Sequence, residues 1–274
     1  MAVLPDPPKA VTLRNVLDFG ARRLTDAGVE NARREMEWIA GHVLGVSRSG
    51  LYADPDRALD ASQVQAAEAL VSRREAREPL AYVLGEWGFR RLTLKTDARA
   101  LVPRPETEIV VERVLALLAG TAAPRVLDIG VGSGAIALSV KDERPDAIVT
   151  GVDVSTEALA LARENAARLG LQVELREQGV EAAADGWDLV VSNPPYVDTL
   201  EGLQPELGFE PEGALLGEGF HALIARTSEA RFLVLEVGGG QAEGVAGVLE
   251  SAGYRDVTIT RDLAGRERVV DGAR

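Results

Sequence analysis

The tetrapeptide Asn193-Pro194-Pro195-Tyr196 is the segment of this chain best suited to chemistry. It follows an apolar run, residues 187–192, that is typical of a buried parallel strand. Ligands of open α/β sheets bind beyond the carboxyl ends of the strands, so we expect the tetrapeptide at the edge of a crevice. Each proline fixes its φ at about −65° and has no N–H, so the backbone is stiff and offers carbonyl acceptors. With the Asn193 side-chain oxygen, these acceptors suit the two hydrogens of a planar –NH2 group.

A second motif lies upstream, where residues 126–129 are typical of a strand that enters a glycine-rich turn. The turn contains Gly130, Val131, Gly132, Ser133 and Gly134, and a helix is predicted from about Ala135 to Lys141. Glycines in such a turn let backbone N–H groups approach a ligand at the helix N-terminus. The pattern fits a nicotinamide dinucleotide as well as S-adenosylmethionine, so the turn alone leaves the cofactor open.

Two acidic residues bear on that choice. Residues 148–153 are typical of a strand that ends at Asp153, whose carboxylate can accept the ribose hydroxyls of an adenosine. Its alternative role, capping the helix expected at 156–169, is weakened because Ser155 is already a good cap. Asp128 precedes the glycines, where a carboxylate suits the cationic methionine end of S-adenosylmethionine better than a pyrophosphate. Together with the tetrapeptide, these acids favour methyl transfer to an amide or exocyclic amine over a Pro-Pro loop that only closes a strand.

Hydrophobic periodicity divides the chain near residue 85. Before that point the pattern is helical, and further on strands and helices alternate, which predicts a doubly wound, mostly parallel sheet with helices on both faces. The expected elements are helices from Thr12 toward Gly28, at 31–44, at about 60–77 and at 106–118, a hairpin at 85–96, and a closing antiparallel pair of strands at 256–260 and 267–271.

Over nearly its whole length, the chain resembles the peptide chain release factor glutamine methyltransferases (the PrmC/HemK family). Beyond the motifs above, the matching segments are residues 77–86, Phe89 with 101–108, 235–238 with Gln241, and 262–270. The string Pro-Arg-Pro-Glu-Thr-Glu at 103–108, followed by Asn-Pro-Pro-Tyr, makes the resemblance specific, because adenine amino-methyltransferases share the tetrapeptide alone.

The resemblance implies an α/β fold: a Rossmann-like class I S-adenosylmethionine-dependent methyltransferase domain with an antiparallel C-terminal edge hairpin. We expect it at residues 101–274, preceded by a helical bundle at 1–85 for substrate recognition and a β-hairpin linker at 86–100. A bundle that only stabilises the enzyme is the alternative. The implied substrate is the glutamine of the Gly-Gly-Gln motif in class I release factors, with S-adenosylhomocysteine as by-product. An adenine amino-methyltransferase acting on DNA or RNA, and a non-catalytic S-adenosylmethionine-binding protein, remain open alternatives.

The family pattern also implies roles for individual residues. The expected catalytic residues are Asn193, Pro194, Pro195 and Tyr196. The expected cofactor-binding residues are Asp128, Gly130, Val131, Gly132, Ser133, Gly134, Asp153, Glu177, Gln178 and Asn193. The chain departs from the pattern at Glu177-Gln178, where the family usually has Asp and a large residue near the adenine. It also departs at residues 217–223, which we interpret as variation in a surface loop.

Composition limits the classes of protein that are possible. The chain has 274 residues, 46% of them hydrophobic, which suits two domains with sizeable cores. Its formal net charge of −13 argues against wrapping bare DNA, so nucleic acid is an unexpected partner. No apolar run approaches the roughly 18 residues of a membrane span. Residues 1–9 have the composition of a short disordered tail and lack the features of a signal peptide, so we expect a cytoplasmic location.

Cysteine is absent, and the two histidines, His42 and His221, are far apart, so no disulfide can form and no metal site is expected. Each histidine is interpreted as a partly exposed helix or loop residue. Basic residues cluster around the expected domain junction, as a face for an acidic partner protein or as ordinary solvated surface. They are Arg73, Arg74, Arg77, Arg90, Arg91, Lys95, Arg99 and Arg104.

Overall fold

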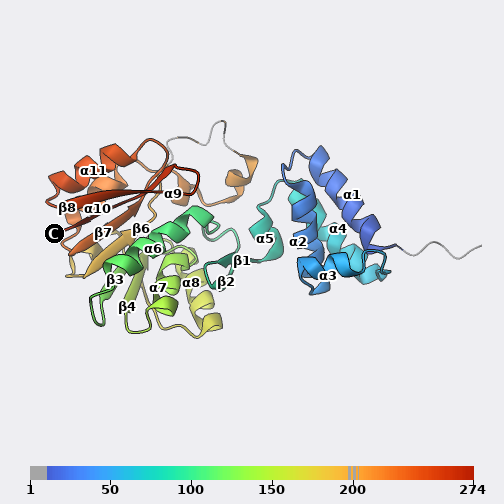
Figure 1. The fold of residues 1–274 in the computed structure, drawn as a ribbon, viewed down its shortest axis with the longest axis horizontal. Helices are drawn as coiled ribbons and strands as arrows, with labels where there is room; N and C mark the ends of the chain where they lie inside the picture. The colour runs from blue at the N-terminus through green and yellow to red at the C-terminus, as the bar shows by residue number, and fades with distance from the viewer. Residues whose placement is uncertain (1–10, 197–198, 200–201, 203) are drawn as a thin grey trace, which may run out of the picture. The chain divides into compact units, whose positions relative to one another are not determined.

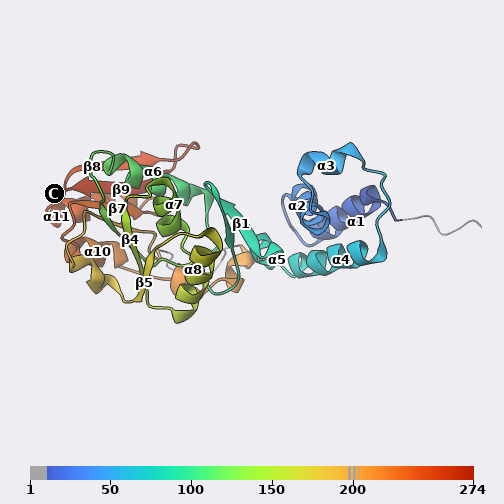
Figure 2. The same ribbon diagram turned by 90° about the horizontal axis from the view of Figure 1, so that it is seen from below.

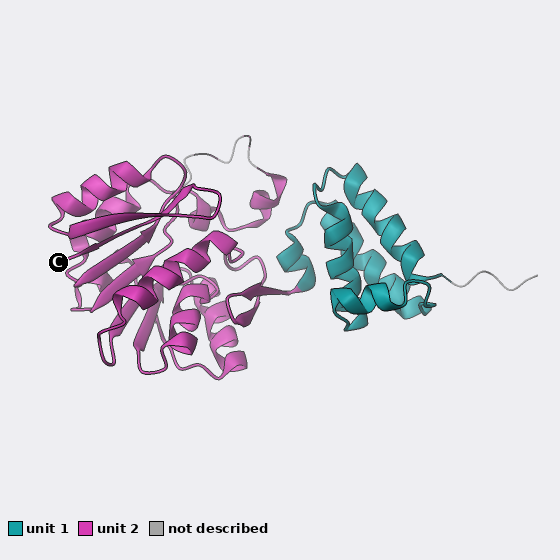
Figure 3. Cartoon of the chain, in the orientation of Figure 1, with its two compact units in different colours: residues 1–84 teal, residues 85–274 magenta. Residues whose placement is uncertain are grey.

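The chain forms two compact units in the computed structural model, residues 1–84 and residues 85–274 (Figure 3). The structure describes residues 11–196, 199, 202 and 204–274. The tail expected at residues 1–9 lies outside the described residues. Among those described, no helix has the length and apolar character needed to cross a bilayer.

The first unit is the expected helical bundle. It contains α1 (Leu13–Asp26), α2 (Ala32–Leu44), α3 (Arg48–Ala53), α4 (Ala61–Glu75) and α5 (Leu80–Leu84). Thr12 and Asp60 each begin a helix with a reciprocal capping box, and Gly45 ends α2 in the left-handed conformation. The short helices α3 and α5 were not predicted, because five or six residues are too few to show a helical period.

The second unit is built on a seven-stranded sheet with the order β5-β4-β3-β6-β7-β9-β8 (Figures 1 and 2). Its strands are β3 (Arg125–Ile129), β4 (Ile148–Asp153), β5 (Glu174–Glu177), β6 (Leu189–Ser192), β7 (Phe232–Glu236), β8 (Arg255–Arg261) and β9 (Glu267–Ala273). Strands β3 to β7 pair in parallel, and β9 runs antiparallel to both β7 and β8. The chain winds outward from β3 to β5 and then returns to β6 on the other side of β3. The order therefore reverses between β3 and β6, which is where doubly wound sheets bind ligands.

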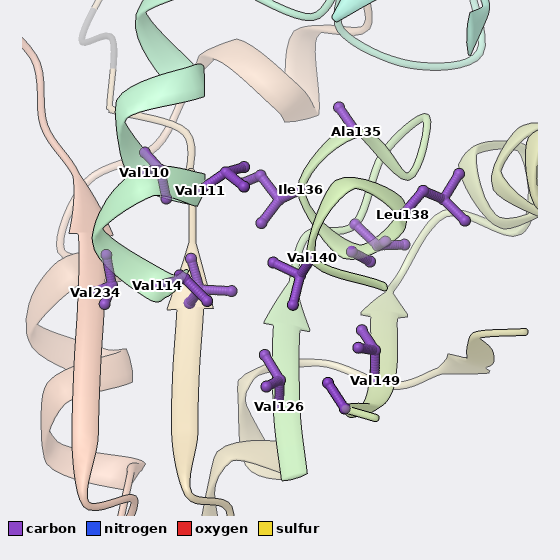
Figure 4. Packing of buried hydrophobic residues seen from close by; sticks show 14 of the residues in the cluster. Val110, Val111, Val114, Val126, Ala135, Ile136, Leu138, Val140, Val149 and Val234 are labelled. Atoms are coloured by element: carbon purple, nitrogen blue, oxygen red, sulfur yellow. The ribbon is translucent and has the colours of Figure 1, made fainter. Parts of the chain in front are cut away.

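Alternate side chains of the strands enter two separate cores, one on each face of the sheet. On one face, α6 (Glu108–Leu117), α7 (Ala135–Glu143) and α8 (Thr156–Leu169) cover Val126, Val149 and Val234 (Figure 4). On the other face, α10 (Phe220–Thr227) and α11 (Ala242–Ser251) cover Leu127, Val190 and Leu233. The remaining short elements are η1 (Pro105–Thr107), η2 (Val180–Ala184), η3 (Pro205–Phe209) and α9 (Glu212–Leu215). Because the central strands are buried on both faces, their sequences are continuous apolar runs.

The hairpin of β1 (Glu86–Phe89) and β2 (Leu92–Lys95) packs into the core of the second unit. Its Phe89 and Leu94 are fully buried in the same core cluster as side chains of α6 and α7. The buried Asn165 of α8 accepts from the Lys95 N–H at 2.7 Å and donates to the Lys95 carbonyl at 3.1 Å. Its amide also donates to the carbonyl of Ser133 at 2.9 Å, so one side chain ties the hairpin to the glycine-rich turn.

Acidic neighbours within each unit pair with most side chains of the basic cluster, and Arg73, Arg91 and Lys95 are still 40–71% exposed. The pairs are Arg73–Glu78, Arg74–Glu35, Arg90–Glu143, Lys95–Glu164, Arg99–Asp97 and Arg104–Glu210. Arg73–Glu78 and Arg99–Asp97 join residues that are close in the sequence. In the other four pairs the two residues are far apart in the sequence, so the pairing could not be predicted. The docking face and the solvated surface both stay predictions.

Replacement of Leu127 by alanine should lower the free energy of unfolding by about 2–5 kcal/mol, because Leu127 is fully buried in the central strand and the change leaves a cavity. Urea unfolding followed by circular dichroism measures the effect. Leu263→Ala is the matched control, since Leu263 is fully exposed and its loss should change stability by less than about 0.5 kcal/mol. Equal effects of the two substitutions would contradict the assignment of the core.

Candidate active site

The register of the parallel strands brings the predicted residues into one row. Ile129 of β3 pairs with Val152 of β4 and with Ser192 of β6, so the residues that follow them lie side by side. Adjacent strands are about 5 Å apart, which makes these residues immediate neighbours at the carboxyl edge of the sheet. The Ser192 hydroxyl also donates to the Ile129 carbonyl at 2.7 Å and closes the ladder at the switch point. Across the sheet, the row consists of Glu177, Asp153, Gly130, Asn193 and Glu236.

The glycine-rich turn is shaped by bonds within the protein. Gly130, Gly132 and Gly134 all have positive φ, from 54° to 89°, which side chains rarely adopt. The N–H groups of Gly130 and Val131 both donate to the Val152 carbonyl at 2.9 Å. The Gly132 N–H donates to the Asp153 carboxylate, and the Gly134 N–H donates to the Val131 carbonyl. Because these four donors are used internally, the turn is poorly suited to a pyrophosphate, contrary to the expectation that its N–H groups face the ligand.

Asp128 is completely buried beneath this turn. Its Oδ2 accepts from the N–H of Ala137 in the first turn of α7 at 3.0 Å, and its Oδ1 has no hydrogen-bonding partner. Burial raises the pKa of Asp128 to about 7, opposed by the Ala137 N–H and assisted by the charge of Asp153. A buried carboxylate with an unsatisfied oxygen fits a cationic ammonium and repels a phosphate. This property of Asp128 favours S-adenosylmethionine over a dinucleotide.

On the other side of the turn, Asp153 receives two backbone donors. Its Oδ2 accepts from Gly132 at 3.0 Å and its Oδ1 from Ser155 at 2.9 Å, while Ser155 caps α8 as predicted. A carboxylate has about four acceptor sites, so capacity for ribose hydroxyls remains. In the next strand Glu177 is exposed, whereas Gln178 is half-buried and its Oε1 lacks a partner. That free acceptor makes Gln178 the better of the two candidates for an adenine amino group.

The tetrapeptide follows β6 as predicted, and its polar atoms are arranged for accepting hydrogen bonds. The Asn193 Nδ2 donates to the Thr107 hydroxyl at 3.3 Å, which leaves Oδ1 directed elsewhere. Among the described residues, none donates to this Oδ1 or to the Pro194 carbonyl. Two strong acceptors on adjacent residues are thus available for one –NH2 group.

The second half of the tetrapeptide is braced from behind. A Cβ at Gly217 would lie 2.9 Å from Pro195, and one at Gly238 would lie 3.0 Å from the ring of Tyr196. The Tyr196 carbonyl accepts from Gln241 at 3.1 Å, and burial raises the pKa of the Tyr196 hydroxyl to about 12. Residues 217–223, the loop and first turn of α10, therefore include part of the wall behind the tetrapeptide. Their interpretation as surface-loop variation stays a prediction.

Three functional candidates were missed by sequence reasoning: Thr107, His221 and Glu236. Glu236 is 1% exposed at the end of β7, where its side chain accepts from the Tyr196 hydroxyl at 3.4 Å and its carbonyl meets His221 Nε2 at 2.8 Å. Burial lowers the pKa of His221, so the imidazole is neutral near pH 7. The sequence did contain one signal for Glu236: it is an acidic residue at the end of an otherwise apolar strand. In the sheet, that strand end lies beside Asn193.

Comparison with known proteins finds two matching family profiles and several similar proteins. Family profiles described as "PrmC N-terminal domain" and "Methyltransferase small domain" match residues 15–85 and 107–207. The release factor glutamine methyltransferase of Geobacter sulfurreducens is 42% identical, covering 98% of this chain and 99% of its own. The protein of that name from Bordetella pertussis is 44% identical, covering 91% and 97%.

The chain belongs to the release factor glutamine methyltransferase family. This confirms the resemblance, the fold class and the cofactor S-adenosylmethionine inferred from the sequence. Among solved structures, the hMettl16 catalytic domain in complex with MAT2A 3'UTR hairpin 6 is 15% identical with a TM-score of 0.51, covering 80% of this chain and 84% of its own. The T. thermophilus 16S rRNA methyltransferase RsmC, in complex with AdoMet and guanosine, is 16% identical with a TM-score of 0.50, covering 69% and 49%. At these identities, the structures show a shared fold.

In this methyltransferase, Gly134→Ala should weaken S-adenosylmethionine binding at least about fivefold, because a side chain at φ 89° costs roughly 1–2 kcal/mol and its Cβ would lie 2.8 Å from Leu138. Isothermal titration calorimetry measures the affinity. Gly170→Ala is the control, since Gly170 also has positive φ but ends α8 with open space around it. That variant should bind normally, and equal weakening of binding in both would contradict the site.

Binding of S-adenosylmethionine should release part of a proton at about pH 6.5, because the ligand's ammonium favours the ionised form of Asp128, whose pKa burial raises to about 7. Affinity should then increase as pH rises through about 7 and level off above. Titrations in buffers of different ionisation enthalpy measure the proton count. Asp128→Asn should abolish this release, and an unchanged count in that variant would exclude Asp128 as its source.

Proposed function

We propose that this protein transfers the methyl group of S-adenosylmethionine to the side-chain amide nitrogen of the Gly-Gly-Gln glutamine in class I peptide chain release factors. The observation that carries the proposal is the pair of free acceptors, Asn193 Oδ1 and the Pro194 carbonyl, directly beside the glycine-rich turn. The names of the curated relatives supply the substrate class. The same proposal places the protein in the cytoplasm, where release factors act.

S-adenosylmethionine, when bound, supplies an electrophilic methyl group. We assign Asp128 to its ammonium group, Asp153 to its ribose, Gln178 to its adenine, and the turn at 130–134 to the backbone that shapes the cavity. Asn193 is assigned to the boundary between cofactor and substrate. The protein's share of the catalysis is then binding, orientation and electrostatics.

An amide nitrogen is a weak nucleophile because its lone pair is delocalised into the carbonyl. Asn193 Oδ1 and the Pro194 carbonyl would accept its two N–H bonds and hold the nitrogen in attacking geometry, which can lower a barrier by up to about 7–11 kcal/mol. As the nitrogen gains positive charge, the same two dipoles stabilise it. Pro195 keeps the turn rigid, and the Tyr196 ring bounds the amide plane. No general base is needed before methyl transfer, because the nitrogen becomes acidic only when the new bond forms. As the C–N bond forms, the C–S bond breaks and S-adenosylhomocysteine leaves, and the nitrogen then loses its extra proton to solvent.

For the helical unit, we propose that it binds the body of the release factor. A groove on this unit is lined by Val11, Val16, Phe19, Met36 and Val71, with Phe19 half-exposed at its rim. An exposed apolar groove of this kind is typical of a protein-binding surface. The unit would add affinity, while the second unit performs the chemistry.

The test is transfer of labelled methyl groups to three substrates in parallel: a purified release factor, its Gln→Ala version in the Gly-Gly-Gln loop, and unmethylated DNA. The proposal expects label on the intact factor alone. Label on DNA would make the protein an adenine amino-methyltransferase. Binding of S-adenosylmethionine without label on any substrate would favour the non-catalytic alternative.

Asn193→Ala should reduce kcat by about 10²-fold or more, the usual consequence of removing one oriented catalytic dipole. Asn193→Asp should lose at least as much, because it adds a charge close to the buried Glu236 and removes the donor to Thr107. Single-turnover kinetics with the release factor measure both effects, and an unchanged thermal unfolding midpoint serves as the control for folding. Wild-type turnover by Asn193→Ala would refute the assignment.

A further inference from the structure

The wall behind Asn193 contains a buried carboxylate that the proposed reaction does not use. Glu236 ends β7 and is 1% exposed. Its Oε1 accepts from the Tyr196 hydroxyl at 3.4 Å, and its Oε2 has no hydrogen-bond partner among the described residues. The Thr107 hydroxyl faces the same carboxylate closely enough to lower its pKa. Both polar neighbours are therefore hydroxyls that can give up a proton to it.

The Thr107 hydroxyl near this carboxylate is also hydrogen-bonded to the asparagine of the tetrapeptide. It is 4% exposed at the end of η1, and its Oγ1 lies 3.3 Å from the Asn193 Nδ2. A hydroxyl has one proton to donate and two lone pairs to accept with. Thr107 thus lies between the Glu236 carboxylate and the Asn193 side-chain amide. The direction of its single O–H bond determines whether the oxygen or the –NH2 group of that amide faces Thr107.

The charge on Glu236 determines that direction. An ionised carboxylate only accepts, so Thr107 donates its proton to Glu236 and offers lone pairs to Asn193. Asn193 must then present its Nδ2–H group to Thr107, and its Oδ1 faces away. A protonated Glu236 could instead donate to Thr107, whose own proton would be free for Oδ1. The Asn193 amide would then turn over, so that its –NH2 group faces the substrate's –NH2 group. An amide nitrogen does not accept hydrogen bonds, so this orientation would be unproductive.

We propose that Glu236, acting through Thr107, is the positioning residue that keeps the Asn193 amide oxygen facing the substrate. This inference rests on the proposed function, because the orientation of Asn193 affects turnover only if Oδ1 accepts a substrate N–H bond. It assigns a role to two residues on η1 and β7 that do not themselves touch the substrate.

Charged and titratable groups from every surrounding segment bear on Glu236. Burial raises its pKa to about 7, which the hydroxyls of Thr107 and Tyr196 and the charge of Arg268 on β9 oppose, and Glu106 on η1 adds to it. From α10, His221 meets the backbone carbonyl of Glu236 and is kept neutral by burial. Because ionised Glu236 holds the productive orientation, kcat at saturating S-adenosylmethionine should increase as pH rises through about 7.

The first test compares Thr107→Val, Thr107→Ser and Thr150→Val with the release factor as substrate. Removal of the hydroxyl should reduce kcat about fivefold to tenfold, the value of one hydrogen bond, without changing the affinity for S-adenosylmethionine. Serine keeps the hydroxyl and should restore kcat to within about twofold of the wild type. Thr150, a buried threonine of β4 below the row, is the matched control and should be neutral. Normal kcat in Thr107→Val, or no recovery with serine, would overturn the proposal.

The second test is the pH profile of kcat for Glu236→Gln. A glutamine can offer either oxygen or N–H to Thr107, so the orientation is no longer fixed and the rise through about pH 7 should disappear. Persistence of that rise would assign it to another group and contradict the role of Glu236. This variant also keeps the proposal testable if Thr107→Val fails to fold.

A third measurement does not depend on turnover. In amide NMR spectra of the enzyme without substrate, the side-chain –NH2 signal of Asn193 should shift with pH through about 7 in the wild type and remain constant in Glu236→Gln. A shifting signal combined with no methylation of any release factor would leave the network in place and refute the proposed substrate. A constant signal in the wild type would refute the network, whichever substrate is methylated.

Discussion

The site depends on the hydrogen-bonded pairing of β3 with β6. Those strands are more than sixty residues apart in the chain, and their pairing sets the glycine-rich turn beside Asn193 with a spacing of about 5 Å. The pairing follows from the winding of the sheet, because the chain can return past β3 only on the side that β4 has not occupied. Ser192, buried between the two strands, strengthens the ladder at its last position. Shifting the register by one residue would send every side chain of β6 to the opposite face and separate the two motifs.

Two buried carboxylates flank this switch point. Asp128 and Glu236 each have one oxygen without a partner, and burial raises the pKa of each to about 7. Such groups destabilise a protein unless something compensates their charge, so their presence marks functional sites. We assign Asp128 to the ligand's own cation and Glu236 to hydroxyls that the protein supplies. Under these proposals, one carboxylate selects the cofactor, and the other sets the direction of the hydrogen bonds that meet the substrate.

Much of this architecture can be predicted from the sequence. The apolar strand runs, the glycines and the cap at Ser155 predict the elements around the cofactor site to within a residue or two. The winding order follows from strand-helix alternation. Thr107 and Glu236 could not be predicted as functional residues, because only their neighbours in the folded structure distinguish them from other threonines and glutamates. Four donors expected to be free at the turn are used within the protein for a related reason. Val152 and Asp153, which come later in the chain, accept from three of those N–H groups, and the Val131 carbonyl accepts from the fourth.

The most direct test of this account is a crystal structure of the enzyme with S-adenosylhomocysteine and a Gly-Gly-Gln peptide. We expect the glutamine –NH2 to donate one hydrogen bond to Asn193 Oδ1 and one to the Pro194 carbonyl, with the Asn193 Nδ2 still bonded to Thr107 and the cofactor's ammonium at Asp128 Oδ1. A glutamine whose amide oxygen, rather than its nitrogen, faces Asn193, or a peptide bound away from the tetrapeptide, would contradict the account.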